Sequence, residues 1–572
     1  MDERPQDPPP PGVEALGSTS LPEPPKRPKS RPGRRLLVAL VAGLALVVGG
    51  GAALAYFVMR GAPERLVGVV PSQADVFVTV YLDPSAGQKA NLLGLARRFP
   101  DLGTDDELQK QVDDVLDQAL ADGGLAHDDV RPWLGSEIGL SVDVGNDGAT
   151  HVALLVATTD TEASQAALEK AAKADSQSFQ RREYDGVQIS VAEGSDRSAY
   201  AIVNEVVVLA SDETTVRRAI DAAHGTTPDI GTSQVYLDTV AALPDGKLGV
   251  AFVNVAGLVD QFGSQAAASA ALGAGGLGEL DAIEGLGMSL SAETDGLALD
   301  VTTNYDPAKL TASQRDLLTA PDHDNATLAF VPADAFAVMA QEHMDTILKT
   351  TLDQIEQASP DAATSIDQAG IHDLLAAMTG DLALEVGPAA AAPVSGALLV
   401  GTDDPETMAT FLQGIAVFGS QVMAQQNPTA VPPPLATEEY QGVKISYLDD
   451  PTLASSGLMP AYAVMDRAGV IATSPQEIHQ LIDTQASGED VRTAPVFSSA
   501  TATVPSTEGV FFLDVQAIAA TVRENLPPDV QAIYDRDVAP NLAPVTALVV
   551  GSESDEQHQR LRVFLQMRGS NR

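Results

Sequence analysis

The sequence predicts an α+β fold of two tandem duplicated units, made mainly of antiparallel sheets with flanking helices, behind one N-terminal transmembrane helix. Three observations predict it. Segments recur in the same order about 260 residues apart, apolar and polar residues alternate in hairpin-like pairs of strands, and residues 36–59 carry no charge.

The first 35 residues form a proline-rich tail without apolar periodicity, which predicts disorder. The tail has seven basic and five acidic side chains, a net charge of +2, whereas the whole chain of 572 residues carries −44. Six basic residues close the tail and are interpreted as a topology signal. They are Lys26, Arg27, Lys29, Arg31, Arg34 and Arg35.

Residues 36–59 are predicted to span a membrane. A helix of this length measures roughly 36 Å, enough for a hydrocarbon core of about 30 Å. Because basic flanks stay in the cytoplasm, we expect a single-pass plasma-membrane protein with a cytoplasmic N-terminus, an extracytoplasmic C-terminal part and the lipid bilayer as a partner. The alternative is a cleaved signal peptide, since Ala53-Leu54-Ala55 has the form of a cleavage site.

The rest of the chain is predicted to be two repeat units, residues 66–320 and 326–568. YDGVQIS at 184–190 is matched by YQGVKIS at 440–446, and GVAF at 249–252 is matched by GVFF at 509–512. Because the period is far longer than 20 to 50 residues, a tandem pair is predicted and not a solenoid.

Local signals supply helices and strands for each unit. Threonine and glutamate at 104–107 predict a capped helix that runs to about residue 120, and Ser474-Pro475-Gln476-Glu477 predicts a second one. Apolar residues at 138–144 alternate with Gly139 and Ser141, so we expect a hairpin strand whose polar face is exposed to solvent.

The composition excludes several functions. A zero cysteine count excludes disulfides, thiolate metal sites and a cysteine nucleophile. The acidic charge argues against nucleic acid as a partner. The glycine-rich sequence at 273–278 fits a dinucleotide fingerprint but lacks a preceding strand, so we interpret it as a loop. We therefore predict no cofactor-binding and no catalytic residues.

No metal site is predicted either. The eight histidines are scattered, and none has a second histidine four residues away. The sequence Asp322-His323-Asp324-Asn325 has ligands for a hard cation, but we interpret it as a turn between the units. The acidic pairs at 105–106, 128–129 and 403–404 lie near helix starts or turns, where carboxylates favour the helix dipole.

One motif stands out, Pro132-Trp133-Leu134-Gly135, which contains the only tryptophan. It is either an exposed aromatic anchor for a partner or a turn whose indole fills the core, and the second is favoured because tryptophan is mostly buried.

Together with this turn, the Val70-Pro71 start and the strand at 76–82 before Asp83-Pro84 carry a resemblance. The chain resembles an uncharacterised bacterial family of membrane-anchored proteins, catalogued as domain of unknown function 3352. The resemblance implies an envelope protein, often behind one membrane helix, and supplies no catalytic residues.

These observations favour a non-enzymatic binding or interaction module of the bacterial cell envelope, whose partner is an unknown envelope protein or an apolar ligand. The alternative is an exported hydrolase or transferase that uses carboxylates, which predicts acidic residues with raised pKa values in one pocket. A third hypothesis is a receptor that signals through a partner docked on the proline-rich tail.

Overall fold

The computed structural model describes most of the chain after residue 64. The described residues are 65–100, 127–145, 149–174, 178–193, 198–262, 280–321, 323–359, 366, 370–389, 392, 394–426, 434–454, 457–506 and 508–568. The proline-rich tail, the segment 36–59, the helix expected after 104–107 and the glycine-rich sequence at 273–278 lie outside them.

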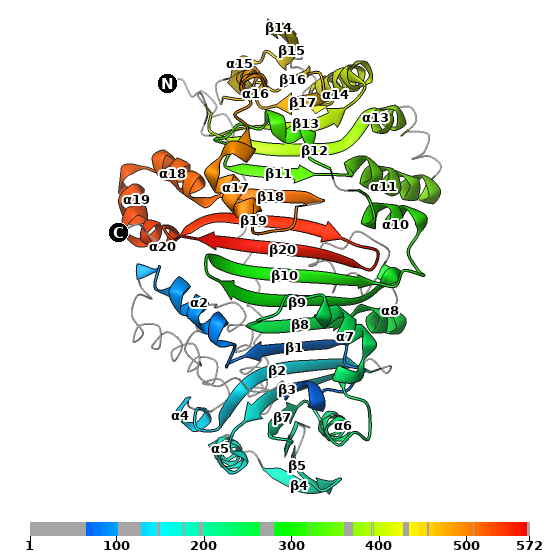
Figure 1. Cartoon of the computed structure of the whole chain (residues 1–572), viewed down its shortest axis with the longest axis vertical. Helices are drawn as coiled ribbons and strands as arrows, with labels where there is room; N and C mark the ends of the chain where they lie inside the picture. Colours follow the sequence, from blue (N-terminus) through cyan, green and yellow to red (C-terminus); the bar gives the residue numbers. More distant parts are fainter. Residues whose placement is uncertain are drawn as a thin grey trace, which may run out of the picture.

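The described strands form one continuous antiparallel sheet of 20 strands (Figure 1). From one edge, the first half contributes β4 (Phe179–Tyr184), β5 (Val187–Ala192), β6 (Ala199–Val203), β7 (Val206–Ala210), β3 (Thr150–Thr158), β2 (Leu134–Val144), β1 (Val76–Tyr81), β8 (Gly249–Asn254), β9 (Ile283–Glu293) and β10 (Gly296–Tyr305). The second half continues with β20 (His558–Met567), β19 (Val545–Ser554), β18 (Gly509–Asp514), β11 (Ala337–Gln341), β12 (Met378–Gly387), β13 (Ser395–Thr402), β17 (Ala468–Ala472), β16 (Ala461–Val464), β15 (Val443–Leu448) and β14 (Leu435–Tyr440).

The strand order is the same in both halves when it is counted from the junction of β10 and β20. Each strand of the second half holds the position of the strand numbered ten lower in the first half. Single hydrogen bonds also correspond, since Ile230 N–H donates to Val70 at 2.8 Å and Val491 N–H donates to Val331 at 2.8 Å. The two halves therefore have the same strand order, counted outward from the junction.

The junction is an antiparallel pair with Asp300 opposite Arg562 at its centre. The register runs from Gly296 opposite Gln566 to Asn304 opposite His558. Arg562 Nη1 lies 3.7 Å from Asp300 Oδ1. Burial raises the pKa of Asp300, and the charge of Arg562 partly offsets that shift. The two halves thus meet through backbone pairing and a largely buried ion pair.

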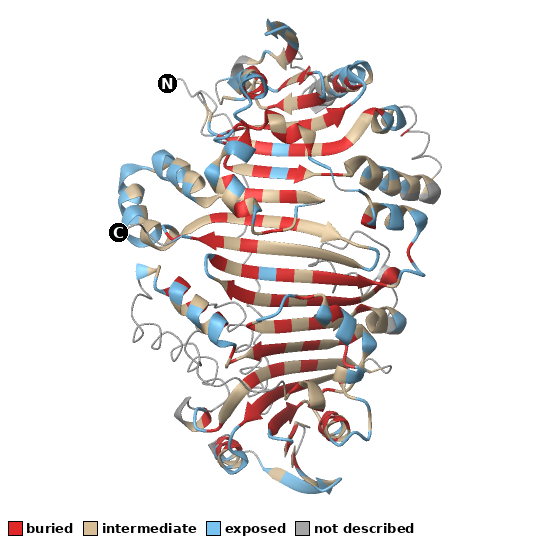
Figure 2. Cartoon of the chain, in the orientation of Figure 1, coloured by how far each residue is buried: buried red, intermediate tan, exposed pale blue. Residues whose placement is uncertain are grey.

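Helices cover both faces of the sheet. One face carries α2 (Ala86–Ala96), α5 (Thr161–Ala174), α8 (Val255–Phe262), α10 (Ala312–Leu318), α11 (Met344–Ala358) and α14 (Pro405–Gln426). The other carries α6 (Glu213–Ala223), α7 (Gln234–Ala241), α16 (Pro475–Ser487) and α17 (Pro495–Thr501) over the two largest apolar cores. Figure 2 shows buried residues along the strands and exposed ones on the outer sides of the helices.

The remaining described helices are short or peripheral. They are α4 (His127–Val130), α13 (Ile371–Ala377), α15 (Pro451–Ala454), α18 (Val515–Asn525), α19 (Pro528–Ile533), α20 (Ala539–Leu542), the 3-10 turns η2 (Val67–Val69), η4 (Ile230–Thr232), η5 (Leu280–Ala282), η6 (Ala326–Phe330) and η7 (Val491–Thr493), and the π-helical turn η8 (Tyr534–Val538).

The α+β class with a large antiparallel sheet is confirmed. Helix α16 begins at Pro475 and is capped by Ser474 Oγ, which accepts from Glu477 N–H at 3.2 Å, as the sequence predicts. The expected solvent-exposed face of β2 is wrong, because Gly139 and Ser141 are buried. A Cβ on Gly139 would lie 2.8 Å from a methyl group of Leu66, so this face packs closely against the core.

The predicted single-pass localisation is corrected by the structure. Among the described residues, no helix is both long enough and apolar enough to cross a membrane. The longest of them, α14, has 22 residues but carries Glu406 and four glutamines, whereas a bilayer core requires about 20 mostly apolar residues. The segment 36–59, on which the prediction depends, lies outside the described residues.

Candidate functional site

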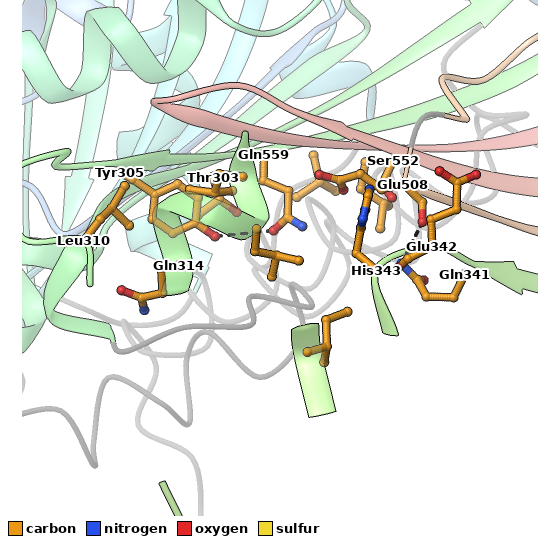
Figure 3. Close-up of a pocket in the computed structure, with 15 residues that line it drawn as sticks. Thr303, Tyr305, Leu310, Gln314, Gln341, Glu342, His343, Glu508, Ser552 and Gln559 are labelled. Carbon is orange, nitrogen blue, oxygen red and sulfur yellow. Dashed lines mark hydrogen bonds between the residues drawn. The ribbon is translucent and has the colours of Figure 1, made fainter. Parts of the chain in front are cut away.

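A cavity of about 180 Å³ lies on one face of the sheet where the two halves meet (Figure 3). Strands β10, β19 and β20 supply one side, α10 and α11 supply another, and residues at the ends of β11 and β18 complete the lining. The lining residues are Val301, Thr303, Tyr305, Leu310, Gln314, Leu317, Leu318, Gln341, Glu342, His343, Ile347, Glu508, Ser552, Gln559 and Leu561.

One end of the cavity is aromatic and apolar. Tyr305 and Leu310 lie at this end, and the Tyr305 hydroxyl donates to Gln559 Oε1 at 3.3 Å (Figure 3). Burial raises the pKa of Tyr305 to about 12, and the charge of Glu508 adds to the shift. The phenol therefore keeps its proton at neutral pH and stays a hydrogen-bond donor.

The other end is ionisable and is positioned by the backbone beyond β11. Glu342 N–H donates to the carbonyl oxygen of Glu508 at 2.9 Å, and Gln341 Nε2 donates to the same oxygen at 2.8 Å. His343 follows as the N-cap of α11 with φ of 55°, a left-handed conformation that is uncommon outside glycine. Gly380 packs closely against this turn, since a Cβ there would lie 2.6 Å from Asp345 Oδ1 and 3.3 Å from the backbone of His343.

A second histidine, His323, lies beside this end. Its Nε2 is 2.6 Å from Asp381 Oδ1, its Nδ1 is 3.7 Å from Glu342 Oε2, and its ring centroid is 5.2 Å from that of His343. One ligand atom from each of His323, Glu342 and His343 lies within 4.8 Å of the others. Asp381 is itself held in place, because its other oxygen accepts from Ala326 N–H at 2.9 Å.

The pKa values of the two histidines are shifted in opposite directions. Partial burial lowers the pKa of His323, but the hydrogen bond and charge of Asp381, together with the charge of Glu342, outweigh it and raise the pKa above its ordinary value. Burial and the neighbouring His323 lower the pKa of His343. His343 is therefore mainly the neutral imidazole at neutral pH, the form that binds metals and accepts hydrogen bonds.

The equivalent place in the first half can be identified from backbone hydrogen bonds. Tyr81 N–H donates to Leu248 at 2.9 Å, as Glu342 N–H donates to Glu508. Leu248 N–H donates in turn to Leu290 at 2.7 Å, as Glu508 N–H donates to Ser552 at 3.3 Å. Tyr81, Leu248 and Leu290 therefore correspond to Glu342, Glu508 and Ser552.

In the first half this place is a packed apolar core. Helix α2 fills it with Leu92 and Leu95. Six apolar residues surround them, and each has a counterpart in the cavity. Leu82, Leu248 and Leu290 correspond to His343, Glu508 and Ser552, respectively. Leu297, Leu565 and Met567 correspond to Gln559, Thr303 and Tyr305, respectively. Of the two equivalent positions, the described residues of the first pack in an apolar cluster, whereas those of the second line a cavity with polar residues.

Sequence reasoning missed this cluster. It named His323 only as part of a turn, and Asp322 of that turn lies outside the described residues. His343 is 20 residues further on, and Glu508 comes from a distant strand. The available signal was a sequence comparison of the two halves, in which Leu82 and Leu248 of the first align with His343 and Glu508 of the second.

The residues that the sequence singled out lie elsewhere. Trp133 is only 3% exposed, its Nε1 donates to the carbonyl oxygen of Asp129 at 2.7 Å, and it packs in an apolar cluster with α5. Pro132 is exposed, and a Cβ on Gly135 would lie 2.7 Å from the carbonyl oxygen of Ala157. None of these residues lines the cavity. The basic cluster, Lys26, Arg27, Lys29, Arg31, Arg34 and Arg35, lies outside the described residues.

A pair of buried carboxyls occurs away from the cavity. Glu385 of β12 and Glu477 of α16 are both under 5% exposed. Burial raises the pKa of Glu385 to about 9, and the charge of Glu477 adds to the shift. Burial also raises the pKa of Glu477. Neither residue lines the cavity, so the described structure does not combine these raised pKa values with the pocket, as the hydrolase hypothesis requires.

Comparisons with known proteins give one family and a distant likeness in structure. A family model described as "Protein of unknown function (DUF3352)" matches residues 39–567. No curated protein matches the chain. Two solved structures of TP0453, in crystal forms I and III, share 12% identity with it at a TM-score of 0.24, and the alignments cover 46% of this chain and 88% and 90% of theirs.

Proposed function

We propose that this chain, which belongs to the family of proteins of unknown function DUF3352, is a non-enzymatic binding module. Its ligand occupies the cavity at the junction of β10 and β20. The observation that carries the proposal is the contrast between the halves, since polar residues line the cavity, whereas leucines pack against one another at the equivalent place. Polar replacements and empty volume both cost stability in a core, so binding gives a reason to keep them.

The ligand that fits is small and has one apolar end and one polar end. A cavity of about 180 Å³ is close to the roughly 150 Å³ of an engineered apolar cavity that binds benzene, so it holds a body of about one ring. Leu310, Leu317 and Leu318 suit that body, and Glu342, His343 and Glu508 suit a polar head group.

The two halves are proposed to be a tandem duplication with units at 66–320 and 326–568. The shared strand order and the corresponding hydrogen bonds support it. In this proposal the first unit has kept the packed core and the second has diverged into the binding unit. The turn with Trp133 is proposed to serve folding of the first unit, since its indole is buried.

A carboxylate-dependent hydrolase or transferase is the weaker alternative. Glu342 and Glu508 do line the cavity, which favours acid–base chemistry in principle. However, Glu385, whose pKa is raised to about 9, and its neighbour Glu477, whose pKa is also raised, lie outside it. Binding therefore needs fewer assumptions than catalysis.

Cavity filling tests the proposal. Benzylamine and benzoate are ring-sized probes with opposite head charges, and at least one is expected to raise the melting temperature of the full chain. Leu561→Phe fills the cavity and should abolish that rise. Leu299→Phe is the matched control, because Leu299 holds the equivalent position in β10 and is 39% exposed. A rise that persists in Leu561→Phe, or no rise with either probe, would contradict the proposal.

A further inference from the structure

At the polar end of the cavity, three side chains that can bind a metal ion lie close together. Two imidazoles and a buried carboxylate offer ligand atoms within 4.8 Å of one another. His323 precedes η6, and Glu342 and His343 directly follow β11. We infer that His323, Glu342 and His343 bind one divalent transition-metal ion of the zinc type. The metal site itself does not depend on the proposed function. Only its role depends on it, namely that the ion binds the polar head group of the ligand.

Hydrogen bonding orients His323 for this role. Its Nε2 is 2.6 Å from Asp381, a carboxylate that can only accept when ionised, so Nε2 carries the proton. In the neutral ring the lone pair is then on Nδ1, the atom that faces Glu342 Oε2 at 3.7 Å. A carboxylate behind a metal-binding histidine is the usual outer partner of such a ligand, because it fixes the tautomer and increases ligand basicity.

The distances suit a tetrahedral ion after small side-chain movements. Zinc–nitrogen and zinc–oxygen bonds of about 2.1 Å place neighbouring donors roughly 3.4 Å apart. The separation of His323 Nδ1 and Glu342 Oε2 is 3.7 Å, close to that value. His343 completes the set within 4.8 Å, and rotation of its imidazole alone can shorten the remaining distances.

The donor set favours zinc over calcium or magnesium. Two imidazole nitrogens and one carboxylate suit zinc and similar transition metals, whereas magnesium and calcium prefer all-oxygen sites. Three protein ligands leave a fourth position open, as in zinc sites that bind an exchangeable ligand. Glu342 and His343 both line the cavity, so that position is available to a molecule inside it.

The first half provides an internal comparison. The equivalents of Glu342 and His343 are Tyr81 and Leu82, and the equivalent of Glu508 is Leu248. The equivalent of Asp381 is Glu137, which accepts from Arg65 N–H at 3.0 Å and Leu66 N–H at 3.2 Å, much as Asp381 accepts from Ala326. A structural carboxylate is therefore shared by both halves, and the metal ligands are confined to the second.

Zinc titration of the full chain tests the inference. Isothermal titration calorimetry after chelator treatment is expected to show one Zn²⁺ per chain. His343→Asn keeps a residue that tolerates φ of 55°, and His323→Gln keeps a donor for Asp381, so both should fold. Each is expected to weaken zinc binding at least tenfold, with circular dichroism as the check on folding.

His479→Gln is the matched control, because His479 is also bonded to a carboxylate, Glu438, at 2.8 Å but far from the cavity. It should bind zinc as the wild type does. Absence of zinc binding in the wild type, full binding by both cavity variants, or magnesium binding of equal strength would overturn the inference.

The two proposals fail separately. Leu561→Phe leaves all three metal ligands in place, so it should still bind zinc while it loses the ring-sized probes. Zinc binding by a chain that binds no probe would support the metal site and count against the ligand cavity. Probe binding by a chain without zinc affinity would support the ligand cavity and count against the metal site.

Discussion

Glu385 lies on β12 with a carboxyl group that is fully enclosed by protein, beside Glu477 of α16. Sequence reasoning assigned Glu477 to a capping box, in which its carboxylate would reach back to the start of the helix. Ser474 does cap α16, but Glu477 is buried and close enough to Glu385 to alter its pKa. Two acids here can be accommodated only if at least one keeps its proton.

Glu385→Gln is expected to stabilise the protein at alkaline pH. The pKa of Glu385 is raised from about 4.5 to about 9 on folding, so the folded state holds the proton more tightly. This stabilisation is complete below about pH 4.5 and is lost as the pH rises towards 9. Urea unfolding at pH 5, 7 and 9 should show a smaller loss of stability in the variant.

Glu439→Gln changes an exposed carboxylate on the edge strand β14; it is the control and should leave the pH profile unchanged. If Glu385→Gln shows the same profile as the wild type, Glu385 is ionised in the folded protein and the raised pKa is wrong.

At the scale of elements, β10 and β20 depend on a charge pair as well as on backbone pairing. Arg562 contacts both Asp300 and Glu293, and Asp300 is 8% exposed. Removing one partner of a buried pair leaves an uncompensated charge, which costs more than the pair itself contributes.

Arg562→Met is therefore expected to lower the free energy of unfolding by about 3 kcal/mol, near the lower limit for a broken buried pair because Arg562 is partly exposed. Urea denaturation followed by circular dichroism measures it. The double variant Asp300→Leu with Arg562→Met should recover much of the loss, because no charge remains buried. A double variant as unstable as the single one would show that packing and not charge accounts for the effect.

The positions of strands were easier to predict from the sequence than which of their faces are buried. Alternation at 288–301 indicates a hairpin, and β9 and β10 form it with Gly296 opposite Glu293. Alternation in β2 correctly indicates a strand but not which face is buried, because helices cover both faces of this sheet. The candidate site was not predictable from periodicity, since sheet pairing alone brings Glu508 to Glu342.

At the scale of the whole molecule, the sheet has two well-separated edges, β4 and β14. Sheet spacing of about 4.8 Å gives 20 strands a width of roughly 90 Å. Both edge strands lack buried residues, and their exposed residues include Arg181 and Arg182 in β4 and Glu439 in β14. Charged edge strands discourage pairing with another chain, so the sheet is expected to end where it does.

Hydrogen–deuterium exchange should follow this arrangement. Strands β9, β10, β19 and β20 have partners on both sides and are expected to exchange most slowly, whereas β4 and β14 have one partner and should exchange fastest. Mass spectrometry of peptides from the full chain measures it. Fast exchange confined to β10 and β20 would instead show that the halves behave as separate domains.

The charges at the junction of β10 and β20 also affect which strands can pair there. Asp300 and Arg562 occupy equivalent positions of equivalent strands and lie opposite each other. Two copies of the first half that met through β10 would place aspartate against aspartate, and two copies of the second half would place arginine against arginine. Like charges directly opposite in a sheet are destabilising. Each half is therefore expected to pair more favourably with the other half than with a copy of itself.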